Sequence, residues 1–231
     1  MLIRYFISLV AACVLLAGCA GSHDASSQYA GGSSWNTQQL IAGARDAADE
    51  SMRLDNRGKA KAAAMHGREL AERCLMTAPE EAGCYYWRAV NTGLYYKIHV
   101  IGYQNGIKQM ISDCEKVISL DARYDHAGAY RMLGELYLKL PQTAGRPDSI
   151  TRDMDLSEKY LRKAVEIAPD YPENQIMLSE VLLEQDNISG AIEALSAARD
   201  LTPRWKNDAS YSDWKSTLMA LEHKIGKAKN K

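Results

Sequence analysis

The sequence predicts an all-α protein, a superhelical stack of about four helix hairpins closed by a C-terminal capping helix. The segment between Pro169 and Pro203 has the 34-residue length of one helix-turn-helix repeat. Small residues at Ser179, Ala191 and Ala198 allow its two antiparallel helices to approach closely, and each Pro ends a helix before the next pair begins. Because one pair cannot bury its apolar face alone, we expect it to stack on neighbouring pairs.

The same pattern returns upstream in weaker form. Three residues precede Pro79 at the separations that Ala191, Leu195 and Ala198 have from Pro203, and these are Gly67, Ala71 and Cys74. The corresponding positions before Pro169 are Ala164, Leu161, Ser157 and, after an insertion, Gly134. These recurrences extend the prediction from a single hairpin to a stack.

Apolar stripes and the breaks between them predict the individual helices. The first helix begins at about residue 36, with Thr37 as its N-cap, and ends at the turn of residues 55–58. An Ala-rich helix follows and stops before Pro79. The later helices are expected over residues 80–100, 107–120, 126–140 and 154–167, twice within 169–203, and from 205 or 208 to 224, where the last helix caps the stack.

Two insertions interrupt the repeat spacing, one near residues 101–106 and one at residues 141–153. Both fall between the two helices of a pair. Loops longer than about a dozen residues are uncommon and often functional. The second insertion is therefore either a functional segment or a passive connector.

The N-terminus resembles the signal of a bacterial lipoprotein. Arg4 precedes an apolar segment at residues 6–17, and small residues then lead to Cys19. The resemblance implies that residues 1–18 are removed, that Cys19 is lipidated, and that the protein is an outer-membrane lipoprotein facing the periplasm. Residues 19–35 then form a flexible tether, 36–226 the helical domain and 227–231 a basic tail. An ordinary signal peptide or a spanning helix is the alternative, although a span needs about 20 apolar residues.

Charge and motifs argue against several classes of function. The chain has 28 Lys and Arg against 29 Asp and Glu, so that losing Arg4 with the signal leaves a net charge of −2 with the signs interspersed. This pattern does not indicate nucleic-acid binding. We find no phosphate loop, dinucleotide Gly pattern or nucleophile elbow, and the 5 His residues lack metal-ligand spacing. We therefore expect no enzyme activity, cofactor or metal; an envelope enzyme would need a buried ionisable cluster.

Cysteine spacing points to one candidate disulfide. Cys74 and Cys84 stand at equal distances on either side of Pro79, on two helices that meet at that turn. An oxidising periplasm permits a bridge between them. The alternative is that both are buried free thiols, as we expect for Cys114 in the core.

On its repeat positions, the chain resembles the tetratricopeptide repeat proteins. The residues that carry the resemblance are Tyr85, Ala89, Leu133, Gly134, Tyr137, Ser157, Leu161, Ala164, Pro169, Leu178, Ser179, Ala191, Leu195, Ala198 and Pro203. The lipoprotein signal and the segment 133–141, which an insertion follows, are similar to a narrower group, the periplasmic lipoproteins that form the T component of TRAP-type transporters. This similarity implies a trimer with a central channel that binds a substrate-binding protein.

In the tetratricopeptide repeat family, the first helix of each pair lines an inner groove that binds a partner. The resemblance transfers this role to Tyr86, Val90, Arg131, Glu135, Lys139, Glu173, Ile176, Glu180 and Glu184. One aromatic residue among charges of both signs suits a protein or peptide better than an apolar small molecule. We therefore expect a membrane-anchored scaffold for a periplasmic protein partner; the alternative is a self-assembling component of an envelope complex or channel.

Overall fold

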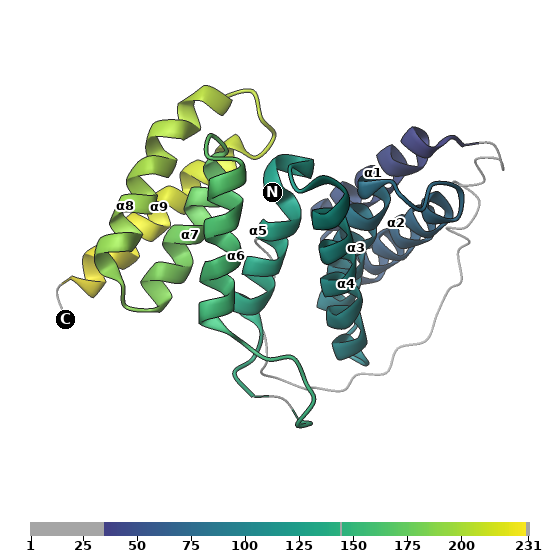
Figure 1. The fold of residues 1–231 in the computed structure, drawn as a ribbon, viewed down its shortest axis with the longest axis horizontal. Coiled ribbons are helices and arrows are strands. Elements are labelled where there is room, and N and C mark those ends of the chain that lie inside the picture. Colours follow the sequence, from purple (N-terminus) through teal and green to yellow (C-terminus); the bar gives the residue numbers. More distant parts are fainter. Residues whose placement is uncertain (1–34, 144, 230–231) are drawn as a thin grey trace.

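A computed structural model describes residues 35–143 and 145–229 (Figure 1). All regular secondary structure in these residues is helical, and consecutive helices pack in pairs, so the predicted all-α hairpin stack is confirmed. The expected signal peptide, Cys19 and most of the tether lie outside the described residues. No helix in the described part of the chain is long and apolar enough to cross a membrane.

The helices follow one another with short connections, except after α5. The first half of the stack contains α1 (Thr37–Arg53), α2 (Arg57–Thr77), α3 (Ala82–Ile98) and α4 (Tyr103–Asp121). The second half contains α5 (Tyr124–Lys139), α6 (Met154–Ile167), α7 (Pro172–Glu184), α8 (Ile188–Leu201), the 3₁₀ turn η2 (Thr202–Trp205) and α9 (Tyr211–Ala228). Figure 1 shows the two halves side by side, with α5 at the centre.

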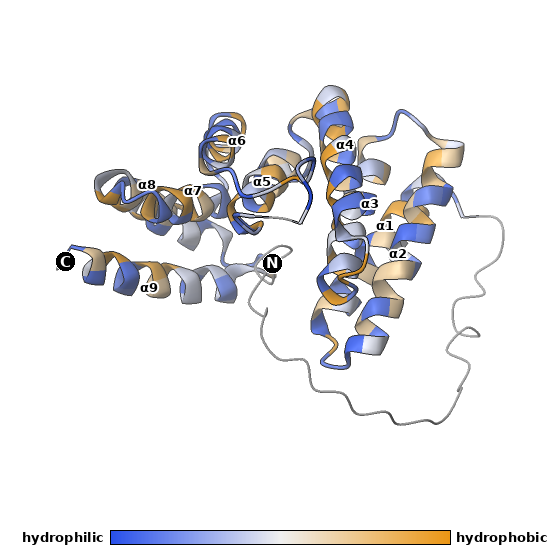
Figure 2. Ribbon diagram, turned by 90° about the horizontal axis from the view of Figure 1, so that it is seen from below, coloured by the Kyte–Doolittle hydropathy of each residue, from blue (hydrophilic) through white to orange (hydrophobic). Residues whose placement is uncertain are grey.

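The odd-numbered helices form the inner layer of the stack. Of these, α1, α3, α5 and α7 each pair with the next helix to make a hairpin, and α1 also packs on α3, α3 on α5, and α5 on α7. The last helix, α9, packs on both α7 and α8, and lies alongside them in Figure 2. This is the position expected of a capping helix, which shields the apolar end of the stack.

Small residues at the predicted positions allow close helix packing. Ala191 and Ala198 are both 0% exposed. The buried Ser179 hydroxyl donates to the carbonyl oxygen of Ala191 at 2.8 Å, and joins α7 to α8. A Cβ atom on Gly134 would lie 2.5 Å from Cγ of Leu161, so only Gly fits between α5 and α6. The buried apolar side chains of the described residues form one continuous core cluster that extends from α1 to α9.

The start of α1 differs from the prediction. Its N-cap is Asn36, not Thr37, because the Asn36 side chain accepts a hydrogen bond from the Gln39 amide at 2.9 Å. The Gln39 side chain in turn accepts from the Asn36 amide at 3.0 Å. This reciprocal capping box satisfies two backbone donors that the helix itself leaves unpaired.

The two insertions lie next to each other. Most of residues 101–106 are helical, because α4 begins at Tyr103 directly after Gly102, whose φ of 73° suits Gly. The Gln104 side chain donates to the carbonyl oxygen of Ile150 at 3.0 Å, and accepts from the Ile150 amide at 2.9 Å. These two bonds join the start of α4 to the loop at 141–153.

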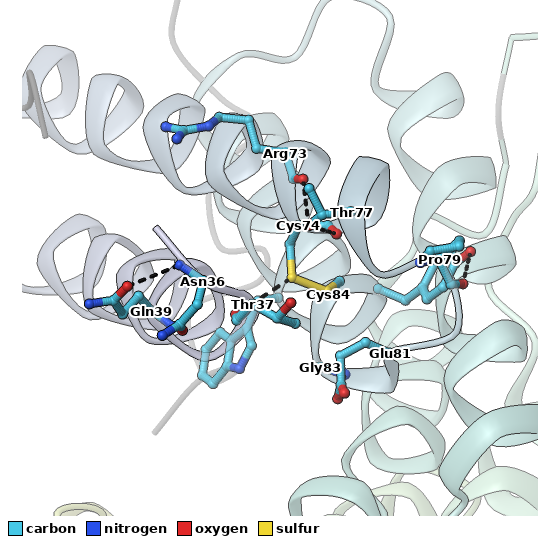
Figure 3. The surroundings of a disulfide bond; sticks show 12 residues. Asn36, Thr37, Gln39, Arg73, Cys74, Thr77, Pro79, Glu81, Gly83 and Cys84 are labelled. Atoms are coloured by element: carbon cyan, nitrogen blue, oxygen red, sulfur yellow. Dashed lines mark hydrogen bonds between the residues drawn. A yellow bond between two sulfur atoms is a disulfide. The ribbon is translucent and has the colours of Figure 1, made fainter. Parts of the chain in front are cut away.

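Cys74 and Cys84 form a disulfide between α2 and α3, with 5.6 Å between their Cα atoms (Figure 3). The first turn of α1 packs against it, and Sγ of Cys74 lies 3.8 Å from the carbonyl oxygen of Thr37. The bridge thus links the first hairpin to the second. Cys114 is a buried free thiol, as expected, and burial raises its pKa.

Candidate functional site

A cleft of about 820 Å³ opens on the inner layer, where the two halves of the stack meet. Residues of α1 form one wall, and residues of α7 together with the segment before α9 form the other. The cleft is lined by Gln38, Ile41, Arg45, Asp46, Asp49, Met52, Arg53, Trp87, Tyr124, Asp125, Arg131, Tyr171, Glu173, Asp208, Ala209 and Ser210. Elements far apart in the sequence therefore build one site.

Arg131 lies at the base of the cleft and is 2% exposed. Its Nη1 donates to Asn174 Oδ1 at 3.0 Å and to the carbonyl oxygen of His126 at 3.1 Å. Its Nη2 donates to Oδ2 of Asp125 at 2.9 Å and to the same residue's carbonyl at 3.2 Å, while Nε lies 3.4 Å from Oε2 of Glu173. Each guanidinium nitrogen thus has an acceptor within the protein.

Two carboxylates keep the buried guanidinium charged. Burial alone would lower the pKa of Arg131, but the carboxylates of Glu173 and Asp125 raise it. The guanidinium also lies over the ring of Tyr171, 4.9 Å from its centroid. Removing Arg131 would leave two carboxylates without their counterion at the base of the cleft.

Arg131 holds an unusual turn that joins the two halves. Asp125, His126 and Ala127 have φ values of 49°, 56° and 64°, so three consecutive residues other than Gly are left-handed. Such a conformation costs about 1–3 kcal/mol per residue and persists only when surrounding contacts impose it. Arg131 bonds two carbonyls of this turn, and Asn174 Nδ2 donates to the carbonyl of His126 at 3.1 Å. We call this segment the left-handed turn.

The left-handed turn corrects the predicted start of the fifth helix. We expected a regular helix from His126, but non-helical backbone angles continue through Ala127 inside α5. On its first-half side, the turn is bonded to α3, because the buried Tyr86 hydroxyl donates to the Asp125 carboxylate. Burial, and then the Asp125 charge, raise the pKa of Tyr86, so this phenol stays protonated and remains a donor.

The structure buries most of the residues that the resemblance assigned to partner binding. Tyr86, Val90, Arg131, Glu135, Glu173 and Ile176 are all buried. Of the predicted set, only Arg131 and Glu173 line the cleft. Six of the nine predicted residues are therefore buried in the stack, and the nine do not gather at this cleft. Their role in partner binding stays a prediction.

Several of the predicted contacts are instead paired with one another. Arg131 of α5 meets Glu173 of α7, and Lys139 of α5 meets Glu180 of α7 through a short ion pair. Glu184 pairs with Arg152 of the preceding loop at 3.2 Å. The complementary charges that suggested a partner surface thus join adjacent hairpins of the same chain.

Glu135 lies between these ion pairs and is not fully satisfied. It is buried, and its Oε2 has no hydrogen-bond partner. Burial, and then the nearby Glu180 carboxylate, raise its pKa well above the usual value, although Lys139 opposes the shift. The protonated form of Glu135 is therefore favoured over a wider pH range than for an exposed Glu.

The walls of the cleft come largely from residues that the sequence prediction did not include. Arg45 and Asp49 stand one turn apart on α1, and Asp208 precedes α9. Extending the inner-helix pattern to the first hairpin would have identified the α1 positions. The segment at 208–210 carries no repeat signal, so only the curvature of the stack brings it to the cleft.

Across residues 35–143 and 145–229, no group of three His, Cys, Asp or Glu side chains is placed to hold a metal ion. Comparison of the chain with models of known protein families and with curated proteins finds no match. The site is thus characterised by its geometry: a preformed cleft between two halves, with aromatic rings and charges of both signs on its walls.

Proposed function

We propose that this protein is a membrane-anchored periplasmic scaffold whose cleft holds a segment of a partner protein. The observation that carries the proposal is the cleft itself, which is lined by residues of both halves. Arg131 with its two carboxylate partners, Asp125 and Glu173, lies at its base, and we call these three residues the Arg131 cluster. A stack of hairpins has few other ways to make a concave surface, and repeat proteins bind partners along such surfaces.

The lining favours a protein segment over an apolar small molecule. Small-molecule pockets are mostly hydrophobic and carry few polar groups. Here two Arg and two Asp side chains of α1 line the cleft together with three aromatic residues, Trp87, Tyr124 and Tyr171. Aromatic and Arg residues are enriched where proteins bind one another.

The N-terminal signal supports the location and the means of attachment. Lipidation of Cys19 would attach the helical domain to the outer membrane through the tether at 19–35. The partner would then be a periplasmic protein, and the similarity to T components suggests the substrate-binding protein of a TRAP-type transporter. Incorporation of an alkyne fatty acid, lost in a Cys19→Ala variant, tests the anchor.

A photo-crosslinking amino acid at Gln38 tests the cleft in living cells. Gln38 is exposed and lines the cleft, whereas Lys159 is exposed on α6 away from it and provides the control position. We expect one discrete crosslinked protein from Gln38 and none from Lys159. A bulky Ala209→Trp substitution at the rim should abolish this product. Equal products from both positions, or a product that survives Ala209→Trp, would contradict the proposal.

One observation favours a second function, self-assembly. Val100 and Ile101 are 69% and 77% exposed in the turn between α3 and α4, beside the joined insertions. Such a pair would be covered in a trimer. Sedimentation velocity on residues 20–231 should then show a trimer that Val100→Ser with Ile101→Ser converts to monomer. A monomeric wild type would remove this alternative.

A further inference from the structure

We infer that the cleft takes an arginine or lysine side chain from the segment that it binds. This inference deepens the proposed function and rests on it, because it states the chemistry of the partner in the same site. It depends on the net charge of the lining, on the complete pairing of Arg131, and on the aromatic residues that line the cleft together with Asp49 and Asp208.

Arg131, the cation at the base of the cleft, has no nitrogen left for an anionic ligand. Every guanidinium nitrogen of Arg131 is committed to Asp125, His126, Asn174 or Glu173. Two carboxylates surround this single cation, so the base carries a net negative charge. A carboxylate or phosphate entering here would meet like charge and no free N–H group.

The walls add to the negative charge. Asp46 lies 3.8 Å from Arg45, so these two charges largely offset each other. That leaves Asp49 and Asp208 against Arg53 among the remaining charged side chains of the lining. Five carboxylates and three guanidinium groups thus line the cleft, whereas the whole chain has a net charge of only −1. The negative excess is concentrated where a partner would bind.

Partial burial makes the Asp49 carboxylate receptive to a cation. Desolvation raises its pKa, and the charges of Arg45 and Arg53 counteract this only in part. An incoming ammonium or guanidinium group would restore favourable electrostatics to this carboxylate. Asp208 is positioned by accepting a hydrogen bond from the Ser210 amide at 2.7 Å.

Aromatic residues complete a site of this kind. Trp87, Tyr124 and Tyr171 line the cleft, and Trp87 Nε1 donates to the Tyr124 hydroxyl at 3.2 Å, which fixes both rings. The Tyr171 ring is already covered by the Arg131 guanidinium, 4.9 Å from its centroid, and by the stacked His126 ring at 4.4 Å. The half-buried Tyr124 is therefore the ring that an incoming cation would meet. Rings beside carboxylates bind Arg and Lys side chains through combined cation–π and ionic attraction.

Short peptides provide the probe. The hexapeptide acetyl-Gly-Ser-Arg-Arg-Ser-Gly-amide is compared with peptides that carry citrulline or Glu in place of both Arg residues. Citrulline preserves the shape of Arg and removes its charge. Binding to residues 20–231 is followed by NMR through the indole N–H of Trp87, with the buried Trp214 indole as an internal reference.

We expect the Arg peptide to bind about tenfold more tightly than the citrulline peptide, and the Glu peptide to bind least. Asp49→Asn and Asp208→Asn should each weaken the Arg peptide about threefold to fivefold, and added salt should do the same. The matched control, Asp200→Asn, changes an exposed carboxylate on α8 outside the lining and should have no effect.

The inference is overturned if the Glu peptide binds as tightly as the Arg peptide, if both cleft variants bind like wild type, or if the Trp87 indole does not respond at millimolar peptide. This failure is distinguishable from failure of the scaffold proposal. A specific crosslink from Gln38 that persists with no preference for Arg would keep the scaffold and reject the cationic segment.

Discussion

The two halves of the stack join their hairpins by different interactions. In the first half, α1, α2 and α3 meet through close backbone approach, with Gly67 against Asn91, and through the Cys74–Cys84 disulfide. In the second half, α5 and α7 are joined by the ion pairs Arg131–Glu173 and Lys139–Glu180. The contact between hairpins in the first half therefore relies on a covalent bond and on shape. The contact in the second half relies on ion pairs, of which Arg131–Glu173 is buried and Lys139–Glu180 is half-buried.

This difference predicts how substitutions in each half affect the stability of the contact between its hairpins. Packing contacts are many, and each contributes little. In the first half, a single substitution should therefore lower the free energy of unfolding in proportion to the volume that it adds or removes. A buried ion pair behaves otherwise, because removing one partner leaves the other charged and desolvated. The cleft lies between the two halves, and the Arg131–Glu173 ion pair of the second half lies at its base.

The largest effect is expected for Arg131→Met. This change leaves Asp125 and Glu173 without their cation and removes the bonds that hold the left-handed turn. We expect a loss of about 3–5 kcal/mol in the free energy of unfolding, measured by urea denaturation. The control Arg162→Met removes an exposed i,i+4 pair with Glu158 and should cost less than about 1 kcal/mol. Equal losses in the free energy of unfolding for the two variants would show that the buried Arg131 ion pairs stabilise the fold no more than an exposed ion pair does.

Removal of the disulfide should have the next largest effect, confined to the first half. The bridge closes a loop with a sequence separation of 10. The chain-entropy model gives about 2–3 kcal/mol for a loop of this size. We expect Cys74→Ala with Cys84→Ala to lower stability by this amount in urea denaturation. Dithiothreitol should destabilise the wild type similarly and leave the double variant unchanged; insensitivity of both proteins would mean that no bridge forms.

A substitution that disturbs packing between α5 and α6 is predicted to lower stability by a smaller amount. The added methyl group of Gly134→Ala would meet Leu161, and should lower the free energy of unfolding by about 1–3 kcal/mol. Gly226 on α9 has nothing within 4 Å of an added Cβ. Gly226→Ala should therefore raise stability by about 0.5–1 kcal/mol through helix propensity. If both changes stabilise the protein, α5 and α6 are not packed as closely as described.

A small effect that depends on pH is expected at Glu135. Its raised pKa means that the folded protein binds a proton that the unfolded chain has already lost, so stability falls as pH rises above about 4.3 towards the folded-state pKa. Glu135→Gln should remove the part of this pH-dependent loss of stability that comes from Glu135. At pH 8 the variant should be about 1 kcal/mol more stable than wild type. Glu193→Gln, an exposed change on α8, should retain the wild-type pH profile; the same profile for Glu135→Gln would contradict the assignment.

The fold was predictable from the sequence because helix geometry sets the spacing of its small residues. Ser179, Ala191 and Ala198 are where two helices must touch, and the structure buries all three. The left-handed turn was not predictable, because Asp125, His126 and Ala127 include no Gly. Their conformation depends on Asn174, which lies on a different hairpin.

The candidate site was predictable only in part. Arg131, Glu135 and Lys139 recur every four residues on one face of α5. Arg131 and Lys139 on this face form ion pairs with α7. The sequence does not reveal whether Glu173 and Glu180 or a separate protein will meet them. Similarly, Asp49 and Asp208 share a cleft only because the stack curves, and that curvature arises from packing angles that no local pattern specifies.

The Arg131 cluster is expected to fix the two halves relative to each other and so to preform the cleft. Spin labels at the exposed positions Ala62 on α2 and Ser196 on α8 allow the distance between the halves to be measured by double electron–electron resonance. We predict one narrow distance distribution for the labelled protein, and a broad one once Arg131→Met is added. A broad distribution with Arg131 present, or a narrow one that is unchanged by Arg131→Met, would contradict the claim.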